Sequence, residues 1–111
     1  MSVKVDLDKV ADALTDYTFA YLVTVSDDYR AHTVAVEPVF ADGLFDVGAV
    51  SGSTRRNLSA HPQVTLVWPP RAPGGYTLIV DGRADGSQIV PDRAVLHRKA
   101  KPGGKDDCHP L

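Results

Sequence analysis

Short runs of β-branched and aromatic residues, each closed by turn-forming residues, recur along this chain of 111 residues. Such runs are typical of strands, and the Asp42-Gly43 pair readily supplies the positive φ of a tight hairpin. The pattern predicts a mainly β domain of about six short strands, closed as a barrel or stacked as a sandwich. We expect the strands at residues 19–25, 30–40, 44–50, 63–68 and 76–84, with 88–90 extending the last strand or pairing beside it.

Helical signals are few and short. Residues 6–16 carry one apolar stripe at helical spacing, with Asp6 as the expected N-cap. One or two helical turns are expected at 55–60. A last helix is expected at 91–99, since proline suits a first helical turn. We expect the tail, 101–111, to be flexible.

Size and charge limit the classes of protein. With 43% hydrophobic residues, residues 1–111 can form one core, so we expect a single domain. The formal net charge of -2 gives no overall basic field, which argues against nucleic acid as a partner. No apolar run approaches the roughly 20 residues that a membrane helix needs, and the first residues do not resemble a signal peptide. Because Cys108 is the single cysteine, the chain fits the reducing cytoplasm.

The segment 51–58, Ser-Gly-Ser-Thr-Arg-Arg-Asn-Leu, lies where a predicted strand gives way to a helix. The first N–H groups of a helix lack partners and favour an anion. Hydroxyl and guanidinium groups can add donors suited to phosphate oxygens. The segment therefore predicts a phosphate or carboxylate site, and a capped helix with two solvated arginines is an equally weighted alternative. The donors are Ser51, Ser53, Thr54, Arg55 and Arg56.

Three stretches resemble the pyridoxamine 5′-phosphate oxidase-like family, including its actinobacterial flavin/deazaflavin oxidoreductase branch. They fall at residues 20–36, 42–67 and 76–84 and together cover most of residues 12–90. The most specific element is Asn-Leu-x-x-x-Pro at 57–62, directly after the basic turn. It is diagnostic only as part of the set.

The resemblance implies a six-stranded Greek-key split β-barrel with short flanking helices. It further implies a homodimer with FMN or the deazaflavin F-420 in a groove between subunits. The five donors of the 51–58 segment would hold the phosphate, and His32, Thr33 and Val34 would line the ring side. Residues near Trp68 would come from the partner subunit. For the Trp68 side chain itself we expect packing at the subunit interface, with stacking over the cofactor ring as the alternative.

The expected activity is hydride transfer to or from a small organic substrate by a flavin- or deazaflavin-dependent oxidoreductase. Family members often carry lysine where this chain has Thr54, which removes one phosphate contact. The alternatives are therefore a non-catalytic cofactor- or haem-binding module, or a structural homodimer that has lost cofactor binding. No metal site is expected, because Cys108 and His109 are adjacent and lack partners at ligand spacing.

Overall fold

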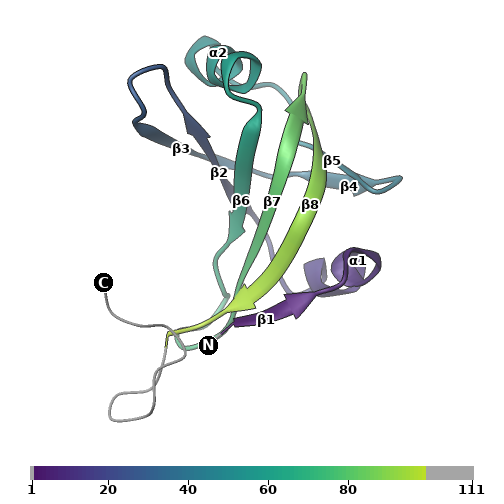
Figure 1. The fold of residues 1–111 in the computed structure, drawn as a ribbon. Coiled ribbons are helices and arrows are strands. Elements are labelled where there is room, and N and C mark those ends of the chain that lie inside the picture. The colour runs from purple at the N-terminus through teal and green to yellow at the C-terminus, as the bar shows by residue number, and fades with distance from the viewer. Residues whose placement is uncertain (1, 100–111) are drawn as a thin grey trace.

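The computed structural model describes residues 2–99. Within that range the chain forms one strongly curved antiparallel sheet of eight strands, with α2 over one end and α1 near the other (Figure 1). In chain order the elements are β1 (Ser2–Val5), the 3-10 turn η1 (Leu7–Lys9), α1 (Val10–Leu14), β2 (Ala20–Val25), β3 (Ala31–Val36), β4 (Val39–Ala41), β5 (Leu44–Asp46), α2 (Gly52–Ala60), β6 (Gln63–Trp68), β7 (Thr77–Asp85) and β8 (Gln88–His97).

The strand order is β3-β2-β6-β7-β8-β5-β4, and β1 pairs with β8 off this path. The long strand β8 has β7 along one side, and on its other side it pairs first with β5 and then with β1. The predicted mainly β architecture with short flanking helices is confirmed. The strands in the described residues number eight rather than about six, because the prediction omitted β1 and joined β3 and β4 into one strand.

The core lies on the concave face of the sheet. Alternate residues of β2, β6 and β7 point inward, so that burial repeats with period two along these strands. Helix α1 adds Val10 and helix α2 adds Leu58, both at most 5% exposed. Helix α2 therefore rests on this core through Leu58. The buried apolar residues are Val10, Ala20, Leu22, Phe45, Val47, Leu58, Val64, Leu66, Trp68, Leu78, Val80, Ile89 and Ala94.

The helix predicted at 91–99 is wrong, since residues 88–97 form strand β8. Pro91 is tolerated there because it lies opposite Gly82 at a register shift in the β7–β8 ladder. On its other side it falls between the residues that pair with β5 and those that pair with β1. A strand can place proline at such an interruption, where no ladder hydrogen bond is lost. The sequence signal was ambiguous, because proline also suits a first helical turn.

The strand predicted at 30–40 is divided, because β3 ends at Val36 and β4 begins at Val39, after Pro38. The predicted Asp-Gly hairpin is confirmed, with φ of 53° at Asp42 and 77° at Gly43. The return strand β5 is shorter than predicted and ends at Asp46. The expected flexible tail, with Cys108 and His109, lies outside the described residues. Across residues 2–99, no helix has the length and apolar character to cross a bilayer.

Candidate functional site

The start of helix α2 uses two of the predicted donors for its own cap. The Ser51 hydroxyl oxygen accepts the N–H of Thr54 at 3.4 Å, and the hydroxyl donates to Thr54 Oγ1 at 3.2 Å. Thr54 is only 3% exposed. These two hydroxyls therefore stabilise the helix start, and of the two residues Thr54 is buried while Ser51 is exposed. Ser53, Arg55 and Arg56 are exposed donors whose side chains take no part in the cap.

The Asn-Leu-x-x-x-Pro element joins α2 to the sheet. The Asn57 side-chain amide donates to Thr24 Oγ1 of β2 at 3.1 Å, and both side chains are buried. Leu58 enters the core. After the helix, the Pro62 carbonyl accepts the N–H of Ala84 from β7 at 2.7 Å. The element thus fixes the helix against β2 at one point and against β7 at another.

A groove lies between α2 and the turn that joins β2 to β3. We call it the β2–β3 groove. His61, at the end of α2, contacts Asp27 of the turn with 2.8 Å between Nε2 and Oδ1. Together with the Asn57–Thr24 hydrogen bond, this contact holds the two walls of the groove in register. The lining residues are Ser26, Asp27, Asp28, His32, Ser53, Arg56, Asn57, Ser59 and Ala60.

The acidic residues of the β2–β3 groove already have partners. Asp28 accepts a hydrogen bond from the Ser26 hydroxyl and lies 3.4 Å from the guanidinium of Arg30. The Ser26 hydrogen bond is the main reason that the pKa of Asp28 lies below its usual value. Asp27 contacts His61. Arg56 has no ion pair within residues 2–99, so it is the cation that this groove offers to a ligand.

The predicted ring-side residues divide between two faces of the sheet. In the β2–β3 ladder His32 lies opposite Thr24 and Val34 lies opposite Leu22, so both share the face of these buried residues. Thr33 pairs with Val23 on the other face. Its side chain therefore points away from the groove that His32 lines.

Trp68 does not line the β2–β3 groove. It is 3% exposed and packs against Phe45, with 5.3 Å between ring centroids. Its side chain is part of the core of its own chain. A contact between Trp68 and a cofactor stays a prediction from the family resemblance alone.

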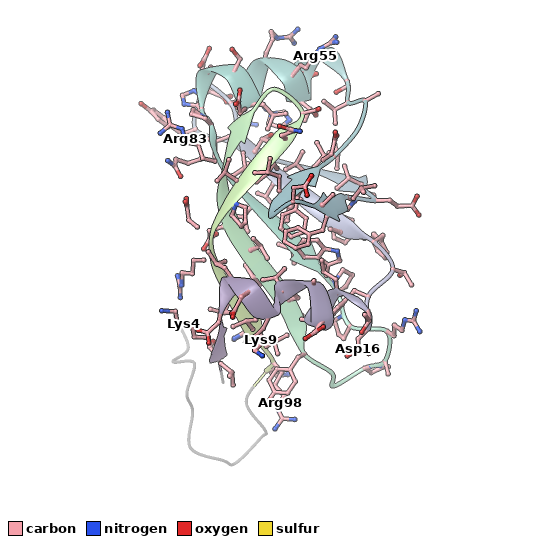
Figure 2. The ribbon with its side chains drawn as sticks, turned by 90° about the vertical axis from the view of Figure 1, so that its right-hand side faces the viewer. Lys4, Lys9, Asp16, Arg55, Arg83 and Arg98 are labelled. Atoms are coloured by element: carbon pink, nitrogen blue, oxygen red, sulfur yellow. The ribbon has the colours of Figure 1, made fainter. Side chains whose placement is uncertain are left out.

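A second groove lies on the other side of α2, against the hairpin of β7 and β8. We call it the β7–β8 groove. Arg56 lines both grooves, and Arg83 of β7 joins Arg55 here; Figure 2 shows Arg55 on α2 and Arg83 beside the upper part of the sheet. Sequence reasoning missed Arg83, because only the strand register places it near α2. The lining residues are Gly48, Ala49, Val50, Gly52, Arg55, Arg56, Leu58, Ser59, Pro62, Arg83, Ala84, Asp85, Gly86 and Ser87.

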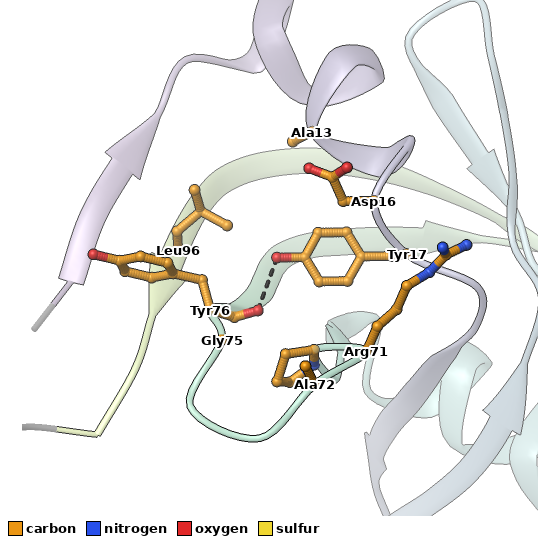
Figure 3. A pocket seen from close by; sticks show the side chains of 9 residues that line it. Ala13, Asp16, Tyr17, Arg71, Ala72, Gly75, Tyr76 and Leu96 are labelled. Carbon is orange, nitrogen blue, oxygen red and sulfur yellow. Dashed lines mark hydrogen bonds between the residues drawn. The ribbon is translucent and has the colours of Figure 1, made fainter.

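A third pocket lies between the end of α1 and the loop before β7, lined in part by Asp16, Arg71 and Leu96 (Figure 3). Tyr17 crosses it and donates its hydroxyl to the Tyr76 carbonyl at 2.8 Å. Burial, reinforced by the nearby Asp16 carboxylate, raises the pKa of Tyr17. None of the predicted cofactor residues lines this pocket.

Two mycobacterial proteins share half of this sequence. Uncharacterised proteins from Mycobacterium bovis and Mycobacterium tuberculosis are each 50% identical to it over 119 aligned residues, covering 89% of this chain and 84% of theirs. The chain belongs to their family. No family model matches the sequence.

Solved structures with the same fold include several flavin- or F-420-related proteins. An FAD-binding protein from Mycobacterium smegmatis matches with a TM-score of 0.61 at 14% identity, covering 86% of this chain and 97% of that one. An F-420 reductase matches with a TM-score of 0.57 at 15% identity, covering 80% and 93%. An FAD-binding protein from Mesorhizobium loti matches with 0.59 at 18% identity over 75% of this chain, which spans only 62% of that longer protein. The split β-barrel fold expected from the resemblance is confirmed.

Proposed function

We propose that the protein binds a flavin or the deazaflavin F-420 and transfers hydride to or from a small organic substrate. The observation that carries the proposal is the β2–β3 groove, which brings Ser53 and Arg56 of α2 together with His32 of β3. The names of the structural relatives, which include two FAD-binding proteins and an F-420 reductase, support the class of cofactor.

The donor set fits the phosphate of such a cofactor. Arg56 supplies a planar fork of N–H donors, and Ser53 supplies a hydroxyl on the same exposed helical turn. The acidic residues of the turn do not compete for Arg56, since Asp27 and Asp28 have other partners. Ser53 and Arg56 would therefore hold the phosphate, with His32 and Val34 on the ring side.

The hydride chemistry belongs to the flavin or deazaflavin ring when it is bound. The chain contributes position and shielding. The Asn57–Thr24 hydrogen bond fixes α2 relative to β2, so that the phosphate donors and the ring-side strand keep one separation. The His61–Asp27 contact links the end of α2 to the turn between β2 and β3.

A second copy of the chain would complete the site. The convex face of the sheet carries apolar side chains that neither helix covers, including Tyr21, which is 39% exposed. Its neighbours on that face are Val23 of β2 and Val67 of β6. We therefore expect a homodimer in which the partner subunit covers the ring, as the family resemblance implies.

Titration of the purified protein with FMN, FAD and F-420 tests the proposal. We expect quenching of cofactor fluorescence with a micromolar Kd for at least one of them at low salt. Riboflavin, which lacks the phosphate, should bind more weakly than FMN if a flavin is the ligand. The absence of binding by all three cofactors would refute the proposal.

A non-catalytic homodimer without a cofactor is the second candidate. It is favoured by Thr54, whose hydroxyl is engaged by Ser51 and which stands where family members often carry lysine. The same titrations separate the two candidates. Binding followed by bleaching of the bound flavin on addition of a hydride donor supports the enzyme, whereas a stable dimer that binds no cofactor supports the alternative.

A further inference from the structure

The β7–β8 groove is a preformed feature with fixed walls. The N–H of Val47, in the loop after β5, donates to the Ser87 carbonyl of the hairpin at 3.0 Å. The N–H of Ala84 donates to the Pro62 carbonyl at 2.7 Å. These two backbone hydrogen bonds connect all three segments that line the groove, namely the loop, α2 with its exit, and the β7–β8 hairpin.

The groove combines an apolar floor with unpaired cations. Val50, Pro62 and Ala84 are half-buried and Leu58 is buried, so apolar atoms form its base. Three arginines line it against one carboxylate, that of Asp85. Within residues 2–99 none of these arginines takes part in an ion pair, which leaves the groove with an excess of positive charge.

We infer that the β7–β8 groove binds a nucleoside phosphate. Arginine recognises phosphate with two parallel N–H donors and also stacks on aromatic rings, so Arg55 and Arg83 suit both parts of such a ligand. The apolar floor accepts the base, and the hydroxyls of Ser59 and Ser87 can bond the sugar. The open volume of about 1010 Å³ is ample for a ligand of this size.

The nucleoside phosphate has two possible sources. It is either a free nucleotide or the nucleotide half of a dinucleotide cofactor whose flavin half occupies the β2–β3 groove. Arg56 lines both grooves and therefore marks the place where one ligand would pass from one to the other. The site itself stands without the proposed function, and only the second source rests on it.

Fluorescence anisotropy of a labelled ADP, N-methylanthraniloyl-ADP, tests the inference on the intact protein. We expect saturable binding at low salt, displaced by unlabelled ADP. The double variant Arg55→Ala/Arg83→Ala should weaken binding at least tenfold. Arg93→Ala is the matched control, because Arg93 is an exposed arginine on β8 outside both grooves, and it should leave the affinity unchanged.

Titrations of the same variants with FMN and FAD separate the two sources. If FAD binds at least tenfold more tightly than FMN and Arg83→Ala removes the difference, the nucleotide is half of a dinucleotide. If labelled ADP binds but FAD shows no advantage, or no flavin binds, the ligand is a free nucleotide. Absence of ADP binding up to about 1 mM would overturn the inference. Binding that survives the double variant would also overturn it.

Discussion

The hydrogen bond from Asn57 to Thr24 makes a strong test of how α2 is attached. Thr24 is 1% exposed and Asn57 is 8% exposed, and their side chains meet at 3.1 Å. Replacing Asn57 with leucine, which has a similar volume, leaves the Thr24 hydroxyl buried without this partner. A buried polar group left unsatisfied costs about 1–3 kcal/mol. For a domain of this size that loss lowers Tm by roughly 4–15 °C.

A double-mutant cycle isolates the bond. Thr24→Val removes the acceptor and should also destabilise the protein, because the Asn57 amide is then left buried. The double variant should lose less than the sum of the two single variants, with a coupling of about 0.5–3 kcal/mol. Urea unfolding at constant m-value measures each free energy. Additive losses would show that the two side chains do not interact, and the account of α2 as a fixed wall would fail.

Three further predictions concern the sheet and its turns. Gly82→Ala should cost about 1–3 kcal/mol, because the new Cβ would lie 2.6 Å from the Val90 carbonyl oxygen; an unchanged urea midpoint would contradict the bulge geometry. Tyr17→Phe should lose the bond to the Tyr76 carbonyl, about 1 kcal/mol. Because the pKa of Tyr17 is raised in the folded state, the stability that Tyr17 contributes is present below its ordinary pKa of 10.0 and is lost as pH rises through the folded pKa. The free energies of unfolding of the wild type and of Tyr17→Phe should therefore converge as pH rises through that range. Free energies that stay equally far apart would refute this. The pKa of Asp28 is lowered, mainly by the Ser26 hydrogen bond, so the stability difference between wild type and Asp28→Asn should hold above the ordinary pKa of 3.8 and be lost as pH falls through the folded pKa; a difference that persists in acid would exclude the hydrogen bond to the Asp28 carboxylate as its origin.

The sequence predicted the elements whose signal is local. The strand at 63–68 matches β6 in both bounds, and the Asp42-Gly43 turn has the expected backbone. The helix expected at 91–99 failed because Pro91 carries the same local signal in a helix start as at a strand interruption. Only the pairing of β8 with β7 distinguishes them. That pairing sets Pro91 opposite Gly82 of the neighbouring strand, a contact between strands that the periodicity of one segment does not report.

The same distinction applies to the site. The helix expected at 55–60 is present, but it begins earlier than predicted, at Gly52. Which of its donors is buried, namely Thr54, depends on where the core lies, and the residue pattern does not contain that information. Arg83 lies near α2 because the β6–β7 register sets it opposite Gln63, directly after the helix, and the sequence alone does not give that register.

The central claim is that Arg56 holds the cofactor phosphate in the β2–β3 groove. The most direct measurement compares the Kd of FMN or F-420, whichever binds, with that of the same ring compound without its phosphate. One charge-assisted hydrogen bond contributes about 1.5–3 kcal/mol, so the wild type should prefer the phosphorylated compound by roughly 10- to 150-fold. Arg56→Ala should lose most of this preference while binding the phosphate-free ring as well as the wild type does. An undiminished preference for the phosphate in Arg56→Ala would contradict the account.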